Sequence, residues 1–124
     1  MLIWRYIGDV EQVSTTGEAF CLVMTSVAKE SEGAALAQAL VQARLAACVQ
    51  LLPIRSFYIW QAKACDEPEH LLLIKTRNEL YTALEAFIRE RHAYEVPEIL
   101  RLPITAGSAA YLAWVRAQTL DVEG

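Results

Sequence analysis

Apolar and polar positions along the chain follow two periods, one typical of strands and one typical of helices. Apolar runs without helical spacing predict strands at residues 19–27, 48–60, 70–75 and 96–104. Apolar positions that recur every three or four residues predict helices at residues 31–46, 78–91 and 109–120. The chain therefore alternates between the two kinds of element and ends on a helix.

Local signals place the boundaries of these elements. Ser31, Asn78 and Ser108 precede the three helices and are predicted to cap them, because their side chains accept hydrogen bonds from free backbone amides. Pro53 predicts a bend or bulge in the second strand. Asp66, Glu67 and Pro68 predict a turn at residues 64–68, before the third strand.

The order of elements predicts the fold class. Two strand–helix–strand units follow one another, as in a ferredoxin-like split βαβ sandwich of the α+β class. Such a fold has an antiparallel sheet with two helices on one face, here followed by a C-terminal helix. With 124 residues the chain fits a single domain, which we expect at residues 19–124, with an N-terminal extension at 1–18.

The predicted sheet is apolar on both faces. Because side chains alternate along a strand, Leu71 and Leu73 point one way while Leu72 and Ile74 point the other. Two helices can cover only one of these faces, and a large exposed apolar patch is unusual for a monomer. We therefore expect an oligomer. The alternative is that the C-terminal helix and the N-terminal extension fold over the second face.

Charge and composition narrow the function. The net charge is −4 and no run of basic residues occurs, which argues against nucleic-acid binding. No apolar stretch is long enough to span a membrane, and the first residues do not resemble a signal peptide, so the cytoplasm is expected. The three widely spaced cysteines indicate neither a disulfide framework nor a zinc site.

No catalytic residues are predicted. The chain contains no phosphate-binding glycine loop, no nucleophile elbow and no zinc-protease motif. Its two histidines, His70 and His92, lie far apart in the sequence. We therefore expect a protein that is not an enzyme.

A series of local strings is more specific than any of these patterns. In chain order they are LAACV at 45–49, SFYIW at 56–60, LLLIKT at 71–76, HAYEVPEI at 92–99 and YLAW at 111–114. Their order and spacing closely resemble the CutA family of divalent-cation tolerance proteins. The resemblance implies a homotrimer that assembles through its sheets and takes part in the response to copper and other divalent ions. The alternative is a signalling or scaffold trimer, similar to the P-II proteins, which binds a small ligand or partner protein without a physiological metal.

The resemblance also implies a metal site, with copper as the expected ion. The family's proposed cysteine, histidine and glutamate ligands correspond to Met24, His92 and Glu98, with Arg91 as the other residue that matches the histidine. Imidazole and carboxylate suit divalent ions, whereas a thioether suits only Cu(I). Two other roles remain open: His92 as a cation that caps the second helix, and Glu98 as an interface or solvent carboxylate.

Five further residues are predicted to lie at the trimer interface. They comprise four aromatic side chains and one acid, namely Tyr58, Trp60, Tyr94, Glu95 and Trp114. Any ligand or metal is expected at the clefts between subunits, near His92 and Glu98.

Overall fold

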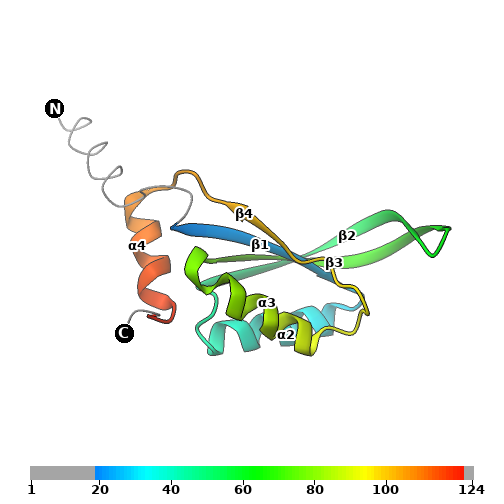
Figure 1. Ribbon diagram of the computed structural model, residues 1–124, viewed down its shortest axis with the longest axis horizontal. Coiled ribbons are helices and arrows are strands. Elements are labelled where there is room, and N and C mark those ends of the chain that lie inside the picture. Colours follow the sequence, from blue (N-terminus) through cyan, green and yellow to red (C-terminus); the bar gives the residue numbers. More distant parts are fainter. Residues whose placement is uncertain (1–18, 122–124) are drawn as a thin grey trace.

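The computed structural model describes residues 19–121, and the predicted extension at 1–18 lies outside this range. The described elements, shown in Figure 1, are β1 (Phe20–Val27), α2 (Glu30–Gln42), β2 (Cys48–Trp60), β3 (Lys63–Arg77), the 3-10 helix η1 (Asn78–Leu80), α3 (Tyr81–Arg91), β4 (Leu100–Pro103) and α4 (Ala109–Gln118). None of the helices in this range is long and apolar enough to cross a membrane.

The strands form one antiparallel sheet in the order β2-β3-β1-β4. Helices α2 and α3 lie on one face of this sheet, and α4 lies at one end of it (Figure 1). This arrangement confirms the predicted ferredoxin-like fold of the α+β class.

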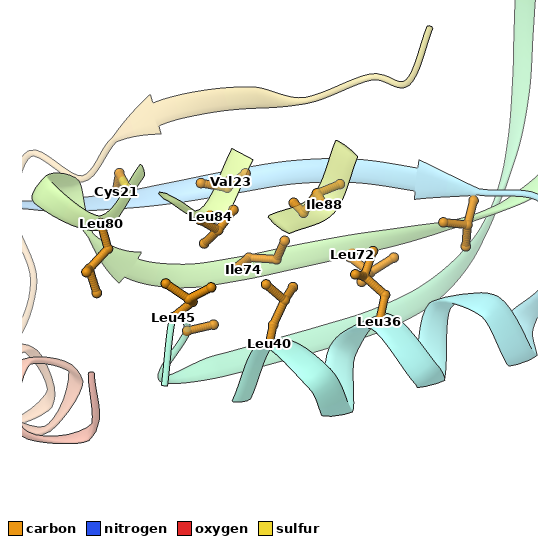
Figure 2. Close-up of a cluster of buried hydrophobic side chains, with 12 residues drawn as sticks. Cys21, Val23, Leu36, Leu40, Leu45, Leu72, Ile74, Leu80, Leu84 and Ile88 are labelled. Atoms are coloured by element: carbon orange, nitrogen blue, oxygen red, sulfur yellow. The ribbon is translucent and has the colours of Figure 1, made fainter. Parts of the chain in front are cut away.

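The core lies between the sheet and the two helices. Figure 2 shows Leu40 of α2 and Leu84 of α3 pointing toward Leu72 and Ile74 of β3, and all four side chains are fully buried. Each large apolar side chain buried in this way stabilises the fold by roughly 1.5–3 kcal/mol. This face of the sheet is therefore buried by helices of the same chain.

The opposite face of the sheet is apolar as well, as the sequence predicts. Helix α4 covers only one end of it, where Leu112 and Val115 pack against Phe20. Farther along, Leu100 is 53% exposed and Leu102 is 40% exposed. Their partners on β1 and β3 that share this face are Leu22, Met24, Leu71 and Leu73, all only partly buried. We call these six residues the open face.

Helix α2 begins and ends earlier than predicted. It begins at Glu30 with Lys29, and not Ser31, at the N-cap. The Glu32 carboxylate accepts a hydrogen bond from the Lys29 amide at 3.2 Å, so this acid satisfies a free amide from inside the first turn. The helix ends at Gln42 because Arg44 takes a left-handed conformation, with φ of 61°, which a helix cannot continue.

The predicted turn at 64–68 is wrong, since these residues belong to β3. The chain reverses instead at Gln61 and Ala62, which have φ values of 51° and 66°. A two-residue hairpin turn with positive φ at both central positions is of type I′ and normally uses asparagine, aspartate or glycine there. None of these occurs here, so the true turn carries no sequence signal.

Pro53 produces no bulge, because the pairing of β2 with β3 runs unbroken through it. Strand β2 lies at the edge of the sheet, where a residue without an N–H is tolerated. The fourth strand is also shorter than predicted, Leu100–Pro103. Asn78 does not cap α3; its side-chain oxygen accepts a hydrogen bond from Arg101 at 2.6 Å. Ser108 caps α4 as predicted.

Candidate functional site

The described residues enclose a cleft of about 640 Å³ at the end of the sheet farthest from α4. The outer half of the β2–β3 hairpin forms one wall, and the loop between α3 and β4 forms the other. Its lining residues are Ser26 of β1, Ser56, Phe57, Tyr58 and Trp60 of β2, Glu69 of β3, and Ala93, Tyr94, Glu95, Val96 and Glu98 of the loop. We call it the loop cleft.

His92 anchors the loop to the sheet. Its Nε2 lies 2.7 Å from the Ser26 carbonyl oxygen, which can only accept, so Nε2 is the protonated nitrogen. Its Nδ1 accepts a hydrogen bond from the Tyr94 amide at 3.1 Å. Both ring nitrogens are therefore occupied, and in this arrangement the ring is neutral.

Two tyrosines donate hydrogen bonds to acids of β3. The Tyr94 hydroxyl donates to Glu69 Oε2 at 2.6 Å, and the Tyr58 hydroxyl donates to Glu67 Oε1 at 2.8 Å. Burial and then the bond to Glu69 raise the pKa of Tyr94. The bond to Glu67 raises the pKa of Tyr58 to about 12. Both hydroxyls therefore stay protonated at neutral pH and hold the loop and hairpin in place.

The loop cleft is acidic and aromatic. Three of its lining residues are the carboxylates Glu69, Glu95 and Glu98, and no lysine or arginine occurs among the described residues that line it. Glu69 is only 6% exposed. Carboxylates that are partly removed from water act on a charged ligand more strongly than exposed ones.

The three predicted metal ligands do not form a ready-made metal centre. Met24 lies on the open face, opposite Leu73 and Leu100, while Glu98 is exposed and lines the loop cleft. His92 would have to give up one of its two hydrogen bonds to bind an ion. Within residues 19–121, no three or more His, Cys, Asp or Glu side chains are grouped so that they could hold a metal.

His92 also does not cap α3 through its ring. It occupies the C-cap position, but its ring bonds go to Ser26 and Tyr94. Arg91 donates to the Phe87 carbonyl of the last turn instead, at 3.2 Å. The cation at the C-terminal end of α3 is therefore Arg91 and not His92.

Of the five predicted interface residues, four meet at the loop cleft: Tyr58, Trp60, Tyr94 and Glu95. Trp114 lies on α4 beside Tyr111, with 5.5 Å between the ring centroids. Glu69 was missed, because residues 64–68 were interpreted as a turn that separated it from the hairpin. The signal that was available is the alternation of Cys65, Glu67 and Glu69, which places them on one face of an extended strand.

The fold and the loop cleft define a ferredoxin-like α+β domain with a long projecting hairpin. Residues 21–118 match the family described as CutA1 divalent ion tolerance protein, and the chain belongs to this family. It is 40% identical over 99 residues to a divalent-cation tolerance protein CutA of Thermus thermophilus, covering 79% of this chain and 96% of that one. The structure is similar to that of CutA from Synechococcus elongatus, with a TM-score of 0.81, 39% identity, and coverage of 85% and 94% of the two chains.

A chloroplastic CutA of Arabidopsis thaliana is 42% identical over 99 residues, which is 79% of this chain. The chain spans about half of that relative's length, 54%. Relatives of this family thus include longer proteins, at least one of which is named as chloroplastic.

Proposed function

We propose that this chain works as a homotrimer in the tolerance of divalent cations. The observation that carries the assembly is the open face, whose leucines α4 leaves uncovered. The hairpin adds to it, since Phe57 and Ile59 are 68% and 70% exposed on the part that projects beyond the body (Figure 1). Copies of one chain can cover both surfaces by closing into a ring, and the trimer is the family's implied state.

Assembly is tested by light scattering on two matched variants. Leu100→Glu places a charge on the open face and should yield monomers. Val41→Glu places the same charge on an exposed apolar site of α2, 43% exposed and outside this face, and should keep the wild-type mass. Equal masses for both variants would contradict assembly through the open face.

The proposed metal ligands are Met24, His92 and Glu98. The proposed ion is copper, bound at clefts between subunits. His92 would bind it by exchanging one hydrogen bond for the metal. Copper(II) titrated into wild-type protein, His92→Ala and Glu98→Ala tests this. Unchanged affinity in both variants would discard the site.

A second function is binding of a small ligand without a physiological metal, by a signalling or scaffold trimer similar to P-II proteins. The occupied nitrogens of His92 favour it, as does a cleft much larger than one ion. The carboxylates of the loop cleft disfavour a nucleotide, because its phosphates would meet like charge. We propose no catalysis and no nucleic-acid partner for either function, and the cytoplasm as the location.

A further inference from the structure

Within residues 19–121, two buried side-chain atoms have no hydrogen-bond partner, Thr25 Oγ1 of β1 and His70 Nδ1 of β3. Thr25 is fully buried, and the His70 ring is half-buried. Buried polar atoms of native proteins are nearly always paired, either with protein groups or with ordered water, because an unpaired one costs free energy. The two atoms therefore indicate a bound partner at this point of the sheet.

The register of β1 and β3 makes these two residues neighbours. Thr25 lies opposite Leu72 and Val27 lies opposite His70, so Thr25 and His70 are diagonal neighbours in the antiparallel pair. They share the face of Leu72, which points toward the helices (Figure 2). Diagonal neighbours lie about 7–8 Å apart, and a molecule that hydrogen-bonds at about 2.8 Å on each side spans about 5.6 Å between two polar atoms. One small molecule can therefore pair with both atoms.

Thr76 of β3 shows how the same side chain is satisfied elsewhere on this face. It is fully buried as well, and its hydroxyl donates to the Leu45 carbonyl oxygen at 2.7 Å. Among the described residues, no group takes that place for Thr25. The two threonines thus differ in their partners and not in their burial.

The surroundings favour an uncharged partner. Val27 and Leu72, which flank the two atoms, are 4% and 0% exposed, and a charge placed among apolar side chains is costly. In the range that the structure describes, no three or more His, Cys, Asp or Glu side chains are grouped to hold a metal ion. Water donates and accepts, so it suits a hydroxyl and either protonation state of Nδ1. Buried waters make 2–4 hydrogen bonds to groups that are otherwise unpaired.

We propose that one buried water molecule bridges Thr25 Oγ1 and His70 Nδ1 on the helix side of the sheet. His70 belongs to the last pair between β3 and β1, beyond which the hairpin projects. The bridge therefore fastens β3 to β1 at the base of the projecting hairpin. Because this site lies on the face opposite the open face, the inference depends on neither proposed function.

Thr25→Val and Thr76→Val are matched variants, since each replaces a fully buried hydroxyl group by a methyl group of similar size. Thr76→Val loses the hydrogen bond to Leu45 and should lower the Tm. Thr25→Val should lower the Tm too, by about 3–6 °C, because it breaks the bridge and leaves His70 Nδ1 unpaired. A Tm that rises or stays unchanged in Thr25→Val would overturn the proposal, because removing a hydroxyl that has no partner does not destabilise a protein. All samples are compared at one protein concentration.

Nitrogen-15 NMR of the imidazole rings gives a local readout on the same variants. The chain has two histidines, so His92 serves as the internal reference. The Nδ1 resonance of His70 should shift in Thr25→Val and stay in place in Thr76→Val. Equal shifts in both variants would show a general change in the core and contradict the bridge.

The direct test is a crystal structure of the full chain purified with EDTA. One water molecule is expected within about 3.2 Å of both Thr25 Oγ1 and His70 Nδ1. A protein group that bonds to either atom in its place would overturn the proposal. Density that occurs only without EDTA would identify a metal ion and overturn it as well.

Discussion

The two halves of the β2–β3 hairpin contrast sharply. The inner half lies over α2 and α3, and its Leu72 and Ile74 are fully buried. The outer half, residues 54–68, extends past the last pair between β3 and β1, which joins His70 to Val27. We call it the hairpin arm. The two strands thus lie in a closed core at one end of the hairpin and carry exposed aromatic and aliphatic side chains at the other.

The contrast shows which apolar side chains are buried within a single copy of the chain. In the body, packing is internal and independent of other molecules. On the arm, Phe57 and Ile59 have no comparable cover from the described residues. An exposed two-stranded ribbon is only marginally stable by itself. The arm and the open face are therefore where we expect copies of the chain to meet.

The largest change in stability is expected in the core between the sheet and the helices α2 and α3. Leu84→Ala removes a fully buried side chain of α3 and leaves a cavity, which should lower the free energy of unfolding by about 2–5 kcal/mol. Urea denaturation measures this loss. The matched Val41→Ala, at an exposed site, should change it by less than about 0.5 kcal/mol. Similar losses at both sites would contradict the core assignment.

The next largest effect is expected on the hairpin arm. It concerns assembly of the chain and should therefore depend on protein concentration. Phe57→Ala removes a ring that we expect to be buried between copies, a contribution of about 1.5–3 kcal/mol. The concentration at which the assembly dissociates should then rise about tenfold or more. Analytical ultracentrifugation over a dilution series measures it. A loss of unfolding stability with no change in dissociation would place Phe57 in an internal contact.

A smaller effect is expected at the tip of the arm. Ala62 holds a left-handed conformation that costs an alanine about 1–2 kcal/mol. Ala62→Gly should remove this strain and, after glycine's own entropic cost, raise stability by about 0.5–1 kcal/mol. Ala64→Gly, in the adjacent strand, should lower stability. The same direction of change at both positions would refute the strained turn.

The smallest effect is expected from an ion pair on the arm. Arg55 donates two hydrogen bonds of 2.7 Å to Asp66, which lowers the pKa of that carboxyl group. Both partners are exposed, so the pair contributes little. Its contribution is present above the unfolded pKa of Asp66 and is lost as the pH falls through the folded one. The difference in thermal stability between wild type and Asp66→Asn should therefore be constant at neutral pH and shrink as the pH falls below the ordinary aspartate pKa of about 3.9.

Much of the fold could be predicted from the sequence because its signals are local. The two-sided apolar run of residues 71–74 predicted the open face, which the structure confirms. The true turn at Gln61 and Ala62 could not be predicted, since neither residue favours positive φ. There the pairing of long strands on both sides imposes the conformation.

The site was less predictable because its contacts are distant in sequence. The sequence indicated His92 and Glu98, but His92 meets Ser26, 66 positions earlier, and this contact occupies its ring. Glu69 and Tyr94 are joined across 25 positions. Such pairs depend on how the loop packs against the hairpin, which no local pattern records.

The central claim is that copies of this chain cover the arm and the open face. The most direct measurement is the mass of the wild-type protein in solution, by light scattering at low micromolar concentration. We predict three times the chain mass of 13.9 kDa. A stable species of 13.9 kDa would contradict the account, because no second copy would then cover the open face or the arm.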